Sequence, residues 1–540
     1  RMTKKKDALS TLIQHLTPSE KRYFKLYAKG NGQQPNNKYI KLFDAVNHPR
    51  GYNEAALQKK LGYTNNSNSL AVAKNYLFQL ILRALRHYHS GNNVLAEVIE
   101  LLQDTHSLYA RRLFGAAQKQ LEKARKLAAE SWRHDLLIII GKWERRMVEQ
   151  EEVANNYLEY YEDIMAREKA AAQQLQIHTT LFTQYKKLFF HNLREGFQKR
   201  DEARNRFFSL LQHPLLEEQQ QLDGPVARLY YLLCYYEYYH GIRDSAQSRI
   251  LAERARAVFE EHPFLIEVHT ESYLTVQVNY LYTQMDAGKL EALRPQIESL
   301  RNLAIPKDRH DLLRRRSIDY FHLMMHYYEL SGRYVEAVET LAPEVKAFFE
   351  AYPHSSVDRD EFYLKLTAAW IYLVVGETEE ARVWLSYLEN EIDRHNFIEF
   401  FTVCRLLQMT VHYDLQNYPL VLSLALSTQR LLEGKNKLSE VDAFVFRFFR
   451  RAGQTEDQAD KQRKLLEQLR RQLAKVLSYT EVSTPYRLDE LILWIDSHLQ
   501  KQSLLELLLA QRQQASESGE GSTPSHLIRY QAGFVLRRGN

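Results

Sequence analysis

The chain has 540 residues, of which 45% are hydrophobic, and it contains only 13 Pro and 19 Gly. This length exceeds that of a single hydrophobic core and calls for several domains or a repeat array, while the scarcity of Pro and Gly disfavours an all-β or low-complexity protein. The charge is uneven, because residues 1–90 hold 16 Lys and Arg against four acids, a net of +12, whereas the remaining 450 residues carry 57 basic and 63 acidic side chains. This asymmetry predicts an N-terminal domain that faces a nucleic acid or an acidic partner; a solvated basic surface without a ligand is the alternative.

The two cysteines, Cys234 and Cys404, lie 170 residues apart in apolar helical stretches. Two such residues cannot form a disulfide framework, so we expect buried free thiols and a reducing compartment. Gln14 and His15 interrupt the N-terminal apolar segment before it reaches the length of a signal peptide. No apolar run reaches the roughly 18 residues of a membrane span. We therefore expect a cytoplasmic protein that does not enter a membrane.

A basic helical N-terminal domain is predicted over residues 1–90. Thr17 followed by Pro18 is typical of a helix start, and Asn53 is placed to cap a short helix that ends at Gly62. The predicted helices cover residues 21–29, 38–46, 54–61 and 70–89, with a polar loop at 30–37.

The last two of these helices, with a glycine-containing turn between them, follow the order of a helix-turn-helix. In that motif the second helix projects basic or amide side chains into a major groove. Because this second helix also carries many Leu, Ile and Phe residues, an ordinary packed helical hairpin is the alternative. The candidate nucleic-acid-binding residues are Lys59, Lys60, Lys74, Arg83 and Arg86.

A nearly even spacing of turns characterises residues 91–435. Turn signals recur at intervals of 40–47 residues, and each interval is predicted to hold two amphipathic helices. Such a region is a stack of helical hairpins. The turns fall near Arg112, Ala154, Gly196, Gly241, Gly288, Gly332, Gly376 and Gln416.

Two of the predicted hairpins share a pattern of aromatic, glycine and small residues. The positions are Tyr328, Gly332, Tyr334 and Ala337 in one and Ala369, Tyr372, Gly376 and Ala381 in the other, with a weaker match over residues 109–124. Small residues let paired helices approach closely, and glycine allows the sharp turn. The region resembles the tetratricopeptide repeat, at a longer pitch than that family's 34 residues. The resemblance implies an all-α, right-handed superhelical solenoid of helical hairpins whose concave face binds proteins.

A helical C-terminal cap is predicted over residues 436–514, where the spacing of the turns changes. We expect it to close the last repeat. Residues 515–540 begin with SESGEGSTPS after Ala515 and are predicted to be a flexible tail. The predicted helices of the cap cover residues 439–451, 462–477 and 488–509.

Candidate partner-binding residues come from two predicted helices of the array. Tyr231, Tyr235 and Tyr238 belong to a tyrosine-rich stretch, for which packing between neighbouring hairpins is the alternative. His322 and His326 are spaced i, i+4 and are expected to line a groove. With Glu329 they offer three ligand atoms, but a structural metal site needs four ligands and a catalytic one needs a base beside the metal. We therefore predict no metal and no cofactor.

No phosphate-binding glycine motif and no nucleophile elbow occurs in the sequence, and an enzymatic activity is not predicted. The first functional hypothesis is a non-enzymatic scaffold or adaptor that binds a protein or peptide on the concave face of the repeat array. The alternative is a nucleic-acid-binding or ribonucleoprotein-binding regulator that uses the basic N-terminal domain, with the repeats as a sensor or docking domain. The oligomeric state is left open.

Overall fold

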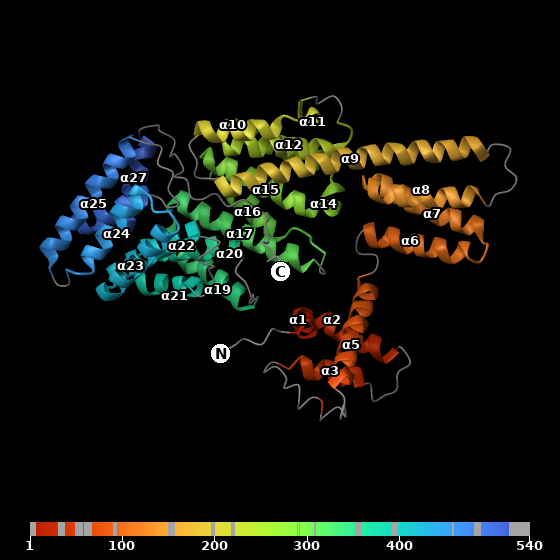
Figure 1. Cartoon of the computed structure of the whole chain (residues 1–540), viewed down its shortest axis with the longest axis horizontal. Coiled ribbons are helices and arrows are strands. Elements are labelled where there is room, and N and C mark those ends of the chain that lie inside the picture. Colours follow the sequence, from red (N-terminus) through yellow and green to blue (C-terminus); the bar gives the residue numbers. More distant parts are fainter. Residues whose placement is uncertain are drawn as a thin grey trace. The chain divides into compact units, whose positions relative to one another are not determined.

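The described part of the chain is built from helices and contains no strand (Figure 1). The prediction of an all-α protein is therefore confirmed. No helix in this part combines the length and the apolar character needed to cross a bilayer. The computed structural model describes residues 7–30, 38–48, 58, 67–89, 94–149, 157–195, 200–217, 222–242, 244–288, 290, 292–306, 309–351, 359–389, 398–455, 458–479 and 488–517.

The chain divides into two compact units, residues 1–165 and 166–540. The division falls within one long helix, α9 (Tyr157–Glu195). The finer domain limits at residues 90, 435 and 514 stay predictions, and the predicted tail lies outside the described residues from residue 518 onward.

In the first unit, three short helices pack on the longer helix α5 around an apolar core that includes Phe24, Phe43 and Leu77. Thr17 caps α2 as predicted: its main-chain N–H donates to Glu20 Oε2 at 2.7 Å, and the Glu20 N–H donates to Thr17 Oγ1 at 3.2 Å. The predicted helix at 54–61 lies outside the described residues apart from Gln58. The helices are α1 (Ala8–His15), α2 (Pro18–Gly30), α3 (Lys38–Val46) and α5 (Ser67–Tyr88).

Three further helices of the first unit follow one another and pack in sequence. The turn predicted near Arg112 is present, with a φ of 60° at that residue. Ala117, Ala124 and Ala128 are fully buried, which lets α7 approach its neighbours closely. The helices are α6 (Val94–Tyr109), α7 (Phe114–Glu130) and α8 (His134–Val148).

The predicted hairpin between Ala154 and Gly196 is wrong, because α9 is a single helix of 39 residues. Residues 157–195 contain neither Gly nor Pro, so nothing in this interval breaks the backbone hydrogen bonding of a helix. The turns predicted near Ala154 and Gly196 lie outside the described residues. The even pitch therefore does not give a helix pair in every interval.

The second unit continues as sequential, mutually packed helix pairs. The turns predicted near Gly241, Gly288, Gly332, Gly376 and Gln416 each lie between two consecutive helices. Gly288, Gly332 and Gly376 have a positive φ that favours glycine. The elements are α10 (Arg200–Leu211), α11 (Pro214–Glu217), α12 (Pro225–Gly241), α13 (Ser245–Glu261), α14 (Leu265–Val268), α15 (Thr270–Asp286), α16 (Arg294–Arg301), α17 (His310–Ser331), α18 (Tyr334–Glu336), the π-helical η2 (Ala337–Leu341), α19 (Ala342–Ala351), α20 (Arg359–Val374), α21 (Thr378–Glu389), α22 (Ile398–Asp414) and α23 (Tyr418–Gly434).

The C-terminal helices contain one more break than predicted. The predicted helix at 488–509 is two helices, because Lys501 has a φ of 57° and Ser503 starts a new one. The Glu506 N–H donates to Ser503 Oγ and the Ser503 N–H donates to Glu506 Oε2, both at 3.2 Å. The helices are α24 (Glu440–Ala452), α25 (Ala459–Tyr479), α26 (Leu488–Gln500) and α27 (Leu504–Glu517).

The last helix returns to the turn between α17 and α18. Arg512 Nη2 donates to the hydroxyl of Tyr334 at 2.9 Å, and the guanidinium lies 5.4 Å from the centre of the same ring. The helices from α17 to α27 therefore close on themselves at this contact. One hydrophobic core runs from α15 to α27.

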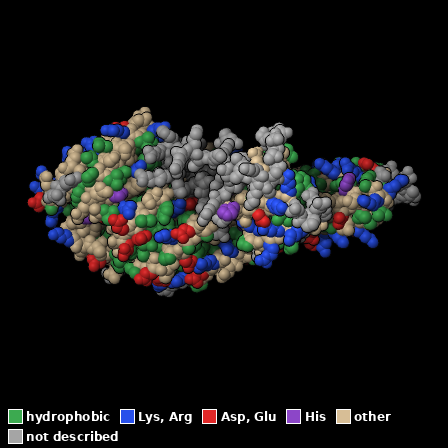
Figure 2. Space-filling model, turned by 90° about the horizontal axis from the view of Figure 1, so that it is seen from below, with side chains coloured by type: hydrophobic (Ala, Val, Ile, Leu, Met, Phe, Trp, Pro, Cys, Tyr) green, Lys and Arg blue, Asp and Glu red, His purple; other side chains and the backbone are tan. Residues whose placement is uncertain are grey.

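On the surface drawn in Figure 2, acidic and basic side chains are interspersed with hydrophobic ones.

Candidate partner-binding face

A buried carboxyl group joins α12 to α9. The side chain of Glu237 is 2% exposed, and Asn192 Nδ2 donates to Glu237 Oε2 at 2.7 Å and to the Glu237 main-chain oxygen at 2.9 Å. Burial raises the pKa of Glu237 to about 7, although the Asn192 hydrogen bond and the nearby Lys186 act in the opposite direction. This junction fixes the second unit's part of α9 against α12.

Lys186 lies on α9 among aromatic side chains of the same helix. Its Nζ is 5.4 Å from the ring of Phe182, 5.0 Å from that of Tyr185 and 5.1 Å from that of Phe189. Burial lowers the pKa of Lys186, while Glu271 favours its charged form. The ring of Phe182 also meets Tyr230 of α12 edge to face, with centroids 5.3 Å apart. Phe182 is nevertheless 41% exposed, whereas Tyr185 and Phe189 are buried, so the group reaches the surface at Phe182.

Arg315 of α17 binds α15, and its charge acts on Tyr185 and Lys186 of this group. Its Nη2 donates to Thr275 Oγ1 at 2.7 Å, its Nη1 donates to the main-chain oxygen of Glu271 at 3.3 Å, and its Nε lies 3.4 Å from the fully buried Asp319 Oδ2. The Glu271 side chain is 62% exposed. We call this surface the Lys186 face and define it as Phe182, Tyr185, Lys186, Tyr230, Glu271 and Arg315.

A buried ion cluster follows between α17 and α20. Arg314 Nη2 lies 2.6 Å from Glu361 Oε2, and Lys365 Nζ lies 3.0 Å from Glu361 Oε1. All three side chains are at most 14% exposed. Glu361 is thus a carboxylate shared by two cations.

The three tyrosines that were predicted to bind a partner belong to α12 but are not part of the Lys186 face. Tyr231 and Tyr235 are half-buried with ring centroids 4.9 Å apart, and the Tyr235 hydroxyl donates to the main-chain oxygen of Leu216 in α11 at 2.9 Å. Tyr238 is buried beside Tyr239. These three tyrosines pack between helices, and Tyr230 of the same run joins the Lys186 face instead.

The two histidines that were predicted to line a groove are largely buried side chains of α17. His322 is 6% exposed. His326 Nδ1 lies 3.6 Å from Glu329 Oε2, and its ring centre is 5.5 Å from that of Tyr282. Within the described residues, no group of three or more His, Cys, Asp or Glu side chains is arranged to hold a metal ion.

The predicted nucleic-acid-binding residues separate into three groups. Lys59 and Lys60 lie outside the described residues. Lys74 is only 13% exposed, and its Nζ lies 3.3 Å from Asp7 Oδ2. Arg83 and Arg86 are exposed on α5, so among the described candidates these two are accessible to a ligand.

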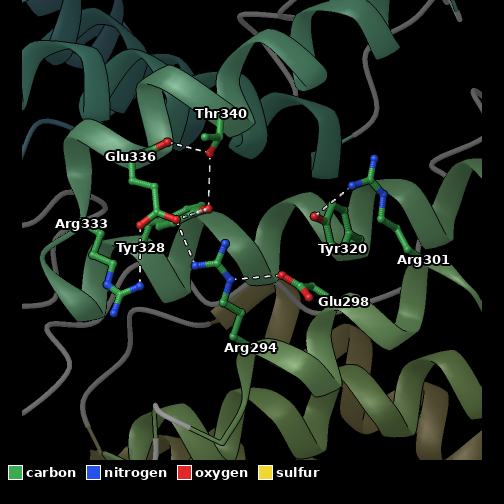
Figure 3. Close-up of polar contacts among 8 residues, drawn as sticks. All are labelled: Arg294, Glu298, Arg301, Tyr320, Tyr328, Arg333, Glu336 and Thr340. Carbon is green, nitrogen blue, oxygen red and sulfur yellow. Dashed lines mark hydrogen bonds and ion pairs between the residues drawn. The ribbon is translucent and has the colours of Figure 1, made fainter.

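Figure 3 shows a second polar network, where α16, α17, α18 and η2 meet. Glu336 lies at its centre: Arg294 Nη1 is 3.0 Å from Glu336 Oε1, and Arg333 Nη1 is 3.6 Å from Oε2. The Tyr328 hydroxyl donates to Glu336 Oε1 at 3.4 Å, and Thr340 Oγ1 donates to the Glu336 main-chain oxygen at 2.7 Å. Hydrogen bonds to Glu298 and then Glu336 raise the pKa of Arg294. The network joins the α16–α17 pair to the next pair.

The Lys186 face was missed by sequence reasoning, although part of its signal is visible. The stretch FTQYKKLFF at residues 182–190 places aromatic residues around a lysine at helical spacing. Glu271 and Arg315 could not be assigned to it, because they come from helices about 90 and 130 residues further along the chain. No protein-family model, curated protein or solved structure matches the chain.

Proposed function

We propose that the protein is a non-enzymatic scaffold that binds a segment of a partner protein. In this proposal the helix pairs of the second unit form a right-handed superhelical solenoid, similar to tetratricopeptide repeats. Support for this arrangement comes from the packing of consecutive helices on one another through the second unit.

The observation that carries the proposal is the composition and exposure of the Lys186 face. Protein-binding surfaces are enriched in aromatic residues and Arg at their centre, with polar groups at the rim. Here the 41% exposed Phe182 lies beside Lys186 and Tyr230, while the 62% exposed carboxylate of Glu271 borders them. The partner segment would place an apolar side chain against Phe182 and a basic group near Glu271.

The test compares two variants of the full chain in capture experiments from cells that express it. Phe182→Ala with Glu271→Arg removes the aromatic contact and inverts the charge at the rim. Tyr387→Ala is the matched control, because Tyr387 is a 45% exposed aromatic residue on α21. A protein captured by the wild type and by the control should bind the double variant more weakly by about tenfold or more, as expected for loss of a hot-spot residue.

The purified partner is then titrated against all three proteins, and thermal unfolding is measured to show that the variants are folded. If the double variant and the control bind every captured protein as the wild type does, the Lys186 face is not the binding surface. If both variants lose binding equally, the loss is not specific to this face, and the proposal fails.

A further inference from the structure

The acidic side chains in the described part of residues 1–90 are paired with basic or histidine side chains of the same domain. Three of the four acidic residues in positions 1–90 lie in the described segments, and each has a basic or histidine partner nearby. None of these three is therefore left to neutralise the remaining Lys and Arg. The pairs are Lys25–Asp44 at 2.6 Å, Lys74–Asp7 at 3.3 Å and His89–Glu20 at 2.9 Å.

Four basic side chains remain exposed on α2 and α5. Arg22 and Lys29 are spaced i, i+7 on α2, and Arg83 and Arg86 are spaced i, i+3 on α5. Each spacing places the two residues on one side of their helix. The described residues provide no ion pair for these four side chains. They form two basic stripes on two helices that pack together.

Aromatic rings lie where the two helices meet. The rings of Tyr23 and Tyr88 are 4.9 Å apart, and those of Tyr27 and His87 are 5.3 Å apart. Tyr23 follows Arg22 directly, and His87 follows Arg86. The rings therefore run between the two basic stripes. On the outer side of α2, Leu26 is 61% exposed and adds an apolar contact between Arg22 and Lys29.

We propose that this α2–α5 face binds a single strand of nucleic acid. Arg and Lys neutralise backbone phosphates and release counterions, and unpaired bases stack on aromatic side chains placed along such a groove. An acidic polypeptide satisfies the charges but offers no bases for the aromatic and apolar groups between them. The proposed contact surface thus lies at the end of α5 that carries Arg83. Lys74 is not part of it, because its ammonium group forms an ion pair with Asp7.

The test uses the full chain and a fluorescently labelled single-stranded oligonucleotide of roughly 20 nucleotides, longer than the site of one small domain. Binding is followed by fluorescence anisotropy between about 50 and 200 mM salt. We expect a steep loss of affinity with salt, at roughly 0.7 log–log units per phosphate contact for a single strand. Arg83→Gln with Arg86→Gln should lower the affinity by about tenfold and reduce that slope by roughly 1.4 units, the share of two phosphate contacts.

The matched control is Lys119→Gln with Lys123→Gln. It also removes two positive charges, from exposed positions of α7 in the same unit, and it should bind as the wild type does. Absence of binding, a salt-independent affinity or an equal loss in the control would overturn the proposal. So would displacement of the oligonucleotide by polyglutamate at the same concentration of charge, which would assign the face to an acidic protein. None of these measurements depends on the capture of a partner protein by the Lys186 face. The two proposals can therefore fail independently of each other.

Discussion

Asn192 and Glu237 are 45 residues apart in the sequence, yet the amide of Asn192 donates to both the carboxylate and the main-chain oxygen of Glu237. The contact makes the interior between α9 and α12 polar at one point. It also leaves a carboxyl group in an environment that disfavours its charge. The stability of the second unit should therefore depend on the protonation of this one group.

We predict that Glu237→Gln stabilises the protein at alkaline pH and has little effect near pH 4.5. The pKa of Glu237 rises from 4.5 to about 7 on folding, so the folded state holds this proton more tightly than the unfolded state does. Stability is then lost as the pH rises from 4.5 through 7, by roughly 3 kcal/mol in all. The amide of Gln can still accept from Asn192 and carries no charge. Thermal unfolding of the wild type and the variant at pH 5 and pH 8 measures the difference.

The control for this prediction is Glu350→Gln on α19, which removes a carboxylate from an exposed position. Its effect on the unfolding temperature should be small and similar at both pH values. A Glu237→Gln variant that is less stable than the wild type at pH 8 would show that the ionised carboxylate is favourable where it lies.

Local sequence signals predicted the helices of this fold better than its site. Thr17 and Ser439 each start a helix as predicted, and both form reciprocal capping contacts with the acid three residues on. The break at Lys501 was missed, although Ser503 and Glu506 carry the same capping pattern. Here the apolar periodicity of the flanking residues obscured a signal that was present.

The even spacing of the turns predicted a break that is absent, whereas the local signals had missed one that is present. It placed turns correctly at Gly332 and Gly376, where the backbone has a positive φ that favours glycine. However, it also predicted two helices in the interval that the single helix α9 occupies. The electrostatic interactions of Lys186 with Glu271 and Arg315 depend on how separate helices pack, which no local pattern reveals. The site could therefore not be predicted, whereas most of the helices could.

A second prediction concerns the carboxylate shared by Arg314 and Lys365. Glu361→Gln should destabilise the second unit by about 3–5 kcal/mol, because it removes the negative charge that two largely buried cations share. Glu344→Gln is the comparison, since Glu344 Oε2 lies 2.8 Å from Arg301 Nη2 in an exposed pair, with 43% and 52% of the two side chains accessible. That variant should lose less than about 1 kcal/mol. Urea unfolding of both variants tests whether burial sets the difference, and equal losses would contradict it.

A third prediction concerns Trp494 in α26. Its Nε1–H donates to Asp414 Oδ1 at 3.0 Å, and His498 Nε2 lies 2.9 Å from the same oxygen. Asp414→Ala removes this acceptor while the indole stays 99% enclosed, since only 1% of Trp494 is exposed. We expect a loss of roughly 1–3 kcal/mol for the unsatisfied N–H, measured by urea unfolding with tryptophan fluorescence. Retained stability would mean that the indole finds another acceptor.

The last prediction tests the return of α27 to the α17–α18 turn. Gly332 and Gly376 both have a left-handed backbone, with φ of 71° and 87°. A Cβ atom at Gly332 would lie 2.9 Å from Leu509 Cδ2, whereas one at Gly376 would meet no atom within 4 Å. Gly376→Ala should therefore cost only the backbone strain of about 1–2 kcal/mol, and Gly332→Ala should cost more.

The extra loss in Gly332→Ala should disappear when Leu509 is shortened as well. In the double variant Gly332→Ala with Leu509→Ala, the new methyl group no longer meets the Leu509 side chain and keeps only ordinary contact distances to Arg512, so the two changes should couple favourably. The free energies of unfolding of the wild type, both single variants and the double variant give this coupling directly. Additive losses would mean that Leu509 does not touch the turn in solution. The closure of the helices between α17 and α27 would then depend on other contacts, such as that of Arg512 with Tyr334.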